Sequence, residues 1–122
     1  MGKKDIIPTS NTHNILTSGT VVKGEIHAEE DFRFDGKIEG NIYCKGKIVI
    51  GAESNVLGDI NCTNIDVMGT VTGAINCANI LILKSTAVVK GNLNTHILEI
   101  EAGSQFEGSI SMIDKANINI LI

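Results

Sequence analysis

Two neighbouring stretches of the chain decide the fold: Val56-Leu57-Gly58-Asp59-Ile60-Asn61-Cys62 and Val71-Thr72-Gly73-Ala74-Ile75-Asn76-Cys77. In both, an aliphatic residue lies two positions before a glycine and another lies two positions after it, with a cysteine two positions further on. Successive side chains of an extended chain point to opposite faces, so this alternation gathers the apolar side chains on one face. Each stretch is therefore predicted to be β-structure with one buried face.

The same unit, apolar-x-Gly-x-apolar, recurs along the whole chain. It occurs as Val22-Gly24-Ile26, Ile38-Gly40-Ile42, Val56-Gly58-Ile60, Val71-Gly73-Ile75, Val89-Gly91-Leu93 and Phe106-Gly108-Ile110, with glycines 15 to 18 residues apart. Two positions after each unit come Ala28, Cys44, Cys62, Cys77, Thr95 and Met112. We assign a further alternating pair to each repeat as Phe32-Phe34, Ile48-Ile50, Ile65-Val67, Ile80-Ile82, Leu98-Ile100 and Ile118-Ile120. Of these 30 positions predicted to face inward, 29 are apolar and only Thr95 is not.

Short strands that repeat about every 17 residues predict an all-β fold, a single three-sided right-handed parallel β-helix (β-solenoid) of about six coils. Each coil adds about 4.8 Å along the axis. Glycines at the predicted corners, Gly36, Gly51, Gly69 and Gly103, are expected to adopt positive φ. The alternative is a left-handed hexapeptide helix, which requires a strict period of six. Glycine spacings of 15 and 16 residues favour the irregular right-handed form.

Composition limits the classes of function. The 122-residue chain carries 10 Lys and Arg against 14 Asp and Glu, a formal net charge of −4, which argues against a nucleic-acid-binding protein. No segment approaches the roughly 20 apolar residues of a membrane span, and no signal peptide is evident. The three cysteines fit a reducing compartment, so we expect a cytoplasmic protein. We expect a flexible tail over residues 1–14 and a β-helix domain over 15–122, with a C-terminal strand at 116–122.

The cysteines and histidines, which often bind metals or act in catalysis, are interpreted here as core and surface residues. Cys44, Cys62 and Cys77 share one inward column and are interpreted as small core residues, since no histidine joins them to complete a metal site. The histidines, His13, His27 and His96, are interpreted as solvated surface residues. The sequence contains no nucleophile–base motif and no phosphate-binding loop. We therefore predict no catalytic, cofactor-binding or metal-binding residue, and a hydrogen-bonded ladder along the outward column His27, Tyr43, Asn61, Asn76, Asn94 and Ser111.

Three stretches carry a resemblance to a known family: Phe32-Arg33-Phe34-Asp35-Gly36, Ile38-Glu39-Gly40-Asn41-Ile42 and Phe106-Glu107-Gly108. Together with the repeated glycine units they resemble the bactofilins, bacterial polymer-forming cytoskeletal proteins, over about residues 15–113. The resemblance implies a three-sided right-handed β-helix that assembles end to end without nucleotide. It also implies filaments that scaffold cell-wall or cell-shape machinery at the inner face of the cytoplasmic membrane. The implied partners are further copies of the chain, the membrane surface, cell-wall enzymes and other cytoskeletal proteins.

The ends of the predicted rod are the candidate polymerisation interface, because an end coil exposes its apolar interior. The three phenylalanines fall in the units that we assign to the ends, and the resemblance points to the last one. The predicted interface residues are Phe106, Ile110 and Met112 at one end, Phe32 and Phe34 at the other, and Ile118 and Ile120 in the C-terminal strand. That strand either caps the C-terminal end or joins its interface. The predicted membrane contacts are Lys3, Lys4, Ile6 and Ile7.

Two other functions remain open from the sequence. A hexapeptide-type acyltransferase would be a compact trimer with a histidine at each subunit boundary. A monomeric binding module would use one flat face of the solenoid and tolerate changes at Phe106. Because no catalytic constellation is visible, the sequence favours a structural protein that is not an enzyme.

Overall fold

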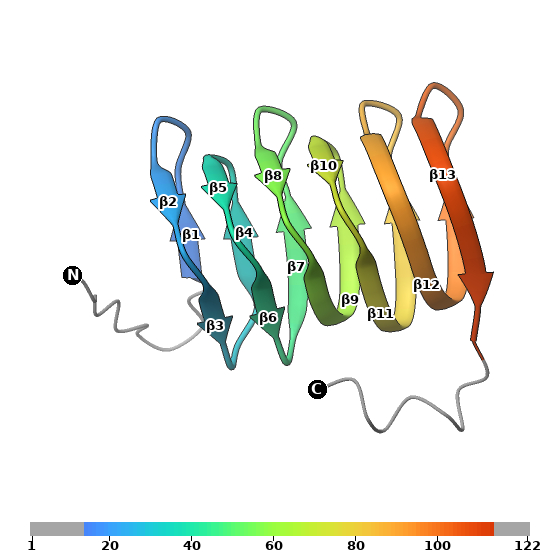
Figure 1. Ribbon diagram of the computed structural model, residues 1–122, viewed down its shortest axis with the longest axis horizontal. Coiled ribbons are helices and arrows are strands. Elements are labelled where there is room, and N and C mark those ends of the chain that lie inside the picture. The colour runs from blue at the N-terminus through green and yellow to red at the C-terminus, as the bar shows by residue number, and fades with distance from the viewer. Residues whose placement is uncertain (1–13, 114–122) are drawn as a thin grey trace.

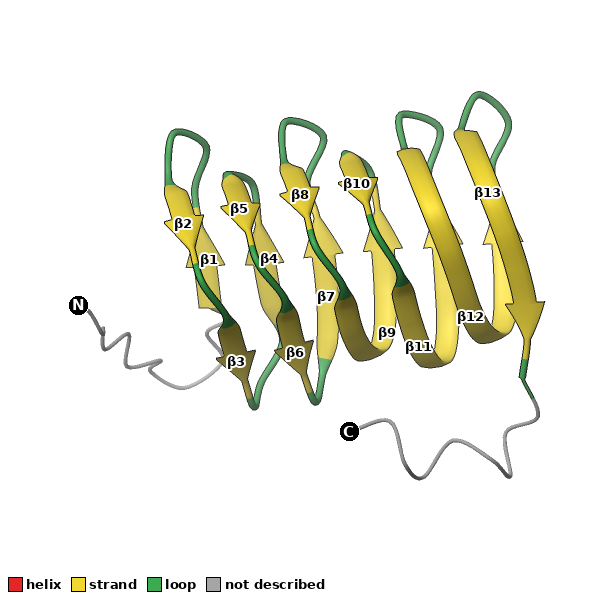
Figure 2. Ribbon diagram, in the orientation of Figure 1, coloured by secondary structure: helices red, strands yellow, loops and turns green. Residues whose placement is uncertain are grey.

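The computed structural model describes residues 14–113, which fold into thirteen strands of one parallel sheet (Figure 1). The strands are β1 (Asn14–Leu16), β2 (Val21–Lys23), β3 (Ile26–Ala28), β4 (Phe32–Phe34), β5 (Lys37–Glu39), β6 (Ile42–Cys44), β7 (Lys47–Ile50), β8 (Asn55–Leu57), β9 (Ile60–Val67), β10 (Thr70–Thr72), β11 (Ile75–Leu83), β12 (Val88–Ile100) and β13 (Gln105–Met112). Strands and short corners account for all the described residues, which contain no helix (Figure 2). The all-β class predicted from the repeat is confirmed.

The sheet coils into three faces, each with six layers. Face A contains β1, β4, β7 and residues 64–67, 80–83 and 97–100. Face B contains β2, β5, β8, β10 and residues 88–90 and 105–107. Face C contains β3, β6 and residues 60–62, 75–77, 93–95 and 110–112. In Figure 1, β2 and β3 follow one another at the front and β1 lies behind them, so one circuit of the chain is one coil of a β-solenoid.

The core is the inside of this coil, filled by the columns that the sequence pattern predicted. Face B contributes Ile38, Val56, Val71 and Val89, and face C contributes Ile42, Ile60, Ile75 and Leu93, all at most 1% exposed. The polar exception is also accommodated. Thr95 is fully buried, and its hydroxyl group lies 3.0 Å from the Ile97 carbonyl oxygen and 3.3 Å from that of Asn79. Because the hydroxyl finds acceptors inside the coil, its burial carries little penalty.

One register in the predicted pattern is wrong. The inward pair in the fifth layer of face A is Leu81 and Leu83, both fully buried, whereas Ile80 and Ile82 lie on the outside and are half-buried. The pairing of β11 with β9 shifts between Cys77 and Ile80, so this corner has one residue more than the corner in β9. All four residues from Ile80 to Leu83 are apolar, so alternation alone could not choose between the two faces.

The glycines serve two different geometries. The repeat glycines have positive φ, for example 143° at Gly91, and a Cβ at Gly91 would collide with the carbonyl oxygen of Gly73 one coil earlier. Of the four corner glycines predicted to have positive φ, only Gly103 does, at 98°. The other three, Gly36, Gly51 and Gly69, leave no room for a Cβ beside atoms of the preceding coil. Close approach between coils, rather than backbone conformation, selects glycine at those corners.

The solenoid extends to the first described residue. β1 begins at Asn14, which the sequence analysis assigned to the tail, and pairs with β4. The remainder of the predicted tail and the predicted strand at 116–122 lie outside the described residues.

Candidate functional site

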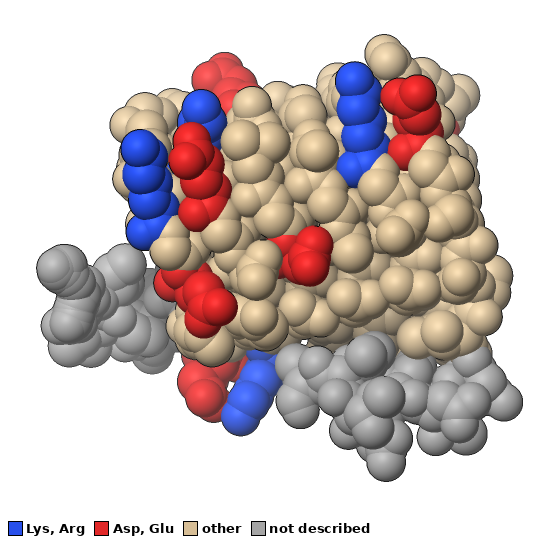
Figure 3. Space-filling view, viewed as in Figure 1, with Lys and Arg blue, Asp and Glu red and all other residues tan. Residues whose placement is uncertain are grey.

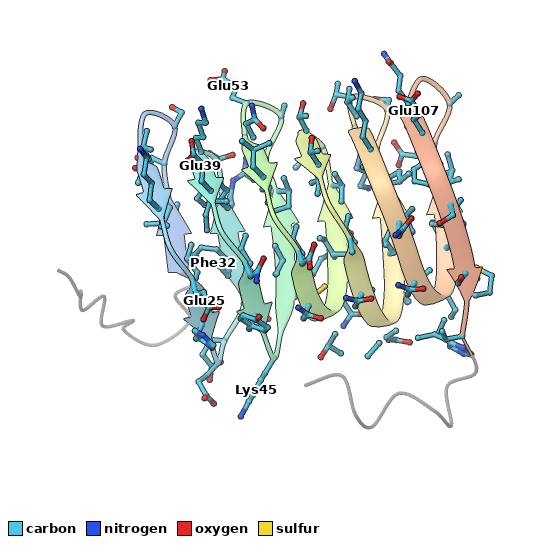
Figure 4. All side chains as sticks on the ribbon, viewed as in Figure 1. Glu25, Phe32, Glu39, Lys45, Glu53 and Glu107 are labelled. Carbon is cyan, nitrogen blue, oxygen red and sulfur yellow. The ribbon has the colours of Figure 1, made fainter. Side chains whose placement is uncertain are left out.

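The C-terminal end of the solenoid exposes the apolar columns of the core. In the layers beneath, the inward residues Leu83, Val89 and Leu93 are at most 1% exposed. The last layer continues those columns with Ile100, Phe106, Ile110 and Met112, together with Leu98. Ile100 is 53% exposed, Ile110 39% and Met112 57%, whereas Leu98 and Phe106 are half-buried against the core. Three of the predicted interface residues, Phe106, Ile110 and Met112, therefore lie together on one end surface, on the strand that also carries Glu107 (Figure 4).

The N-terminal end is built from residues other than those predicted. β1 lies over β4 with Leu16 opposite Phe34, so Phe32 and Phe34 are 3% and 0% exposed. Their rings, with centroids 6.1 Å apart, pack inside the second layer, where Figure 4 labels Phe32. The prediction that these two phenylalanines form an end surface is therefore corrected. The sequence-based assignment placed the start of the first coil at Val22 and therefore missed β1. Leu16, which precedes Phe34 by about one repeat length, was the signal that could have revealed this strand.

The N-terminal end surface consists of smaller aliphatic side chains. Leu16, Val22, Ile26 and Ala28 are half-buried and pack against the core from β1, β2 and β3. Among residues 14–113, only one side of each of these strands is paired with another coil. Both ends therefore combine partly exposed apolar side chains with a parallel backbone edge, and such an edge can accept a further strand.

The side of the solenoid on face C carries the predicted polar ladder. The Asn76 amide donates to the Asn61 side-chain oxygen at 3.1 Å, and the Asn94 amide donates to that of Asn76 at 2.8 Å. The column continues with His27 and Tyr43, whose rings stack with centroids 4.8 Å apart. A second hydrogen bond between asparagine side chains, from Asn79 to Asn64 at 3.1 Å, lies at the corner after face C and was not predicted, because neither residue belongs to a predicted column. Figure 3 shows that the surface of faces B and C is mostly uncharged between its two ends.

The cysteines belong to the core. Cys44, Cys62 and Cys77 are free thiols, fully buried in the inward column of face C. Burial raises the pKa of the Cys62 thiol well above its usual value, which keeps the sulfur protonated and unreactive. Among residues 14–113, no three His, Cys, Asp or Glu side chains gather in a way that could hold a metal ion. The three cysteines of this column therefore serve as packing residues of the core.

The two described histidines have separate local contacts. His27 Nε2 lies 3.2 Å from the Glu25 carboxylate, and His96 Nδ1 lies 3.1 Å from the Ile113 carbonyl oxygen. His27 lies in the first coil and His96 lies at the corner between the fifth and sixth coils, so the structure does not bring them together. No helix within the described part of the chain has the length and hydrophobicity to cross a membrane. The predicted contacts Lys3, Lys4, Ile6, Ile7, Ile118 and Ile120, together with His13, lie outside the described residues.

This fold, with apolar columns that reach both ends and with polar ladders on its side, defines a β-solenoid structural protein suited to stacking. A family model described as "Bactofilin: Polymer-forming cytoskeletal" matches residues 14–111. The chain therefore belongs to the bactofilin family, as the resemblance of its glycine units predicted.

Two known proteins are similar over most of the chain. The bactofilin BacO of Myxococcus xanthus (strain DK1622) is 29% identical over 104 residues, which cover 85% of this chain and 82% of that protein. A bactofilin of Thermus thermophilus, reconstructed by cryo-electron microscopy as double helical filaments, superimposes with a TM-score of 0.79 at 27% identity, covering 82% of this chain and 99% of the other. The chain is thus a member of a structural, polymer-forming cytoskeletal family, and neither alternative function gains support from these comparisons.

Proposed function

We propose that this protein polymerises end to end, without nucleotide, into filaments that scaffold cell-shape or cell-wall machinery. The observation that carries the proposal is the exposure of the core columns at the C-terminal end, where Ile100, Ile110 and Met112 are 39% to 57% exposed. The second to fifth layers bury the same positions completely. A second copy stacked on this end would bury them as another coil does.

Two physical terms favour that contact. Covering an aliphatic side chain contributes roughly 25 cal/mol for each Å² of apolar surface removed from water. The backbone edge of the last layer also gains hydrogen bonds when a strand of a neighbouring subunit continues the parallel ladder. Neither term involves a bound nucleotide, and residues 14–113 contain no phosphate-binding loop. Assembly is therefore proposed to depend on concentration alone.

A charge placed on the end surface tests the proposal. Met112 continues the inward column of face C and is 57% exposed. Met112→Arg should therefore leave the subunit folded but place a cation in the proposed contact. Ser111 is its neighbour on β13 but lies in the outward column, so Ser111→Arg is the matched control. Negative-stain electron microscopy and sedimentation without nucleotide should give filaments for the unmodified protein and for Ser111→Arg, and single subunits for Met112→Arg.

The same experiment can contradict the proposal in two ways. Uniform small particles in all three samples would rule out a polymer under these conditions. Filaments that persist in Met112→Arg, and also in Phe106→Arg, would place the contact away from the C-terminal end. Circular dichroism of each variant establishes that the β-solenoid remains folded.

The proposal extends to the inner face of the cytoplasmic membrane, with Lys3, Lys4, Ile6 and Ile7 as the contacts. Two lysines and two isoleucines bind an anionic surface weakly, but a filament presents many copies and multiplies the effect. The protein should co-sediment with anionic phospholipid vesicles and not with zwitterionic ones. The double variant Lys3→Glu, Lys4→Glu should lose this binding while still forming filaments. Equal binding by the double variant would contradict the assignment of these residues.

A further inference from the structure

Face B carries an outward column whose charges follow a pattern along the solenoid. Register partners on successive strands align six outward side chains, one from each layer: Lys23, Glu39, Leu57, Thr72, Lys90 and Glu107. From the first layer to the sixth, this column reads cation, anion, two uncharged residues, cation, anion. Figure 3 shows charged side chains over β2 and β5 at one end and over β12 and β13 at the other, with an uncharged stretch over β8 and β10.

The side chains of this column are available to a partner. All six are exposed, including Leu57 at 40%. Within residues 14–113, Glu39 is the only member of the column in an ion pair, a 3.8 Å contact with Lys37 in which both side chains are nearly half exposed. A second molecule could therefore meet these charges without breaking strong contacts.

A second copy of the chain, turned end for end and laid face to face, complements the column. A two-fold axis that crosses face B between the third and fourth layers places the first layer of one copy opposite the sixth layer of the other. Lys23 then lies opposite Glu107, and Glu39 lies opposite Lys90. The uncharged third and fourth layers meet at the centre. Because the axis is two-fold, each opposite-charge pair occurs twice.

Other arrangements of two copies lose this match. Parallel copies in register place every charge of the column opposite its own kind. Antiparallel copies shifted by one layer bring Glu39 opposite Glu107 or, in the other direction, Lys23 opposite Lys90. A parallel pair staggered by one layer forms two opposite-charge pairs rather than four. The pattern therefore selects one orientation and one register, as complementary charges do at protein interfaces.

The rest of face B fits the same arrangement. In its other outward column, Val21 falls opposite Gln105 and Lys37 falls opposite Val88, so no charge of that column meets its own kind. Val21 is 60% exposed and Leu57 lies at the uncharged centre, so the contact also covers apolar surface. An uncharged centre with a charged rim is typical of contacts between proteins.

We propose that face B is a lateral contact surface through which two antiparallel copies of this chain pair, with Lys23 against Glu107 and Glu39 against Lys90. The contact uses a side of the solenoid and leaves both ends free to stack. Exposed charge pairs stabilise a contact only weakly, so two single subunits separate readily. The contact becomes strong where filaments repeat it, and this consequence rests on the proposed function.

Zero-length carbodiimide cross-linking with mass spectrometry tests the contact, because the reagent joins an amine and a carboxylate that touch. Lys90 and Glu39 lie three layers apart in one chain, about 14 Å, and a head-to-tail stack leaves them equally far apart. In a mixture of ordinary and isotope-labelled protein, their cross-link should therefore join one chain of each kind. Lys84 and Glu101, 3.4 Å apart in one chain, should give a cross-link with a single label and control for the reagent.

Reversal of the other charge pair tests the register. Lys23→Glu places like charges opposite each other at both edges of the contact and should lower the yield of the cross-link between Lys90 and Glu39 about tenfold. Addition of Glu107→Lys to this variant restores opposite charges and should restore the yield. Lys45→Glu makes the same change in net charge at the corner after face C, where the lysine is 63% exposed, and should leave the yield unchanged.

The cross-link reports on the side contact in single subunits and in filaments alike. Its presence without filaments would count against the proposed end-to-end assembly and would still support the lateral contact. Its absence in a concentration series that reaches the solubility limit would overturn the lateral contact. An equal yield in Lys23→Glu and in the unmodified protein would overturn the antiparallel register.

Discussion

At the scale of single residues, the closeness of successive coils controls which side chain is possible. Each repeat glycine has positive φ, and each one after the first lies directly against the carbonyl group of the repeat glycine one coil earlier. A Cβ would therefore meet two separate obstacles, a strained backbone and a collision. Gly24 separates them, because it has a φ of 127° but belongs to the first coil and has nothing within 4 Å of the Cβ position.

The pair Gly91→Ala and Gly24→Ala measures the collision by itself. Both variants force alanine into a positive φ, at 143° and 127° respectively, but only Gly91→Ala also drives a methyl group into the preceding coil. Overpacking of this kind costs typically about 1–3 kcal/mol, so Gly91→Ala should lower the free energy of unfolding by that much more than Gly24→Ala. Urea unfolding of dilute protein is the measurement. Equal losses would mean that backbone strain alone explains the glycine column.

At the scale of the strand, a corner decides which face of a uniformly apolar segment is buried. In β11 the one-residue shift after Cys77 turns Leu81 and Leu83 inward and leaves Ile80 and Ile82 outside. At that corner the Asn79 and Asn64 side chains share a hydrogen bond, with the same 15-residue offset that pairs Cys77 with Cys62 before the shift. One additional corner residue therefore decides which side chains of this strand pack in the core.

Truncation of two adjacent residues in β11 tests that register. Leu81→Ala should lower the free energy of unfolding by about 2–5 kcal/mol, because it leaves a cavity in the core. Ile80→Ala removes a half-buried side chain on the outside and should cost about 1 kcal/mol or less. Thermal or urea unfolding compares the two variants. The reverse order of stability would restore the register in which Ile80 and Ile82 face inward.

At the scale of the whole molecule, the open ends of the solenoid determine how copies could associate. The described end surfaces are formed by aliphatic, aromatic and methionine side chains, whereas charged residues such as Lys23 and Glu107 lie in outward columns. An interface of this kind depends on removal of apolar surface from water rather than on ion pairs.

Salt therefore provides a test of the assembled state. At about 0.5 M NaCl, where charges a few ångströms apart are already screened, the sedimented fraction of polymer should be unchanged. Ammonium sulfate, which strengthens apolar association, should increase that fraction. Loss of polymer in NaCl alone would indicate that ion pairs hold the subunits together. The Met112→Arg variant is the control for protein that sediments without specific end contacts.

Much of this protein could be predicted from the sequence alone. Alternation of period two, repeated about every 17 residues, determines the strands, the inward columns and the family, because side-chain direction in an extended chain follows from position. It also predicts the asparagine ladder and the end position of Phe106, Ile110 and Met112, since these depend only on counting from a glycine. The burial of three cysteines in one column follows from the same count.

The remainder was decided only by contacts between coils. The repeated glycine unit did not extend to β1, where Leu16 continues an apolar column one repeat length before Phe34, so only the folded coil revealed that β1 covers Phe32 and Phe34. It could not choose between Ile80 and Leu81, since both are apolar and the corner length fixes the face. Nor could it separate glycines selected by positive φ from Gly36, Gly51 and Gly69, which are selected by the nearness of the preceding coil. Each of these features depends on the distance between residues one repeat apart, and only the folded coil fixes that distance.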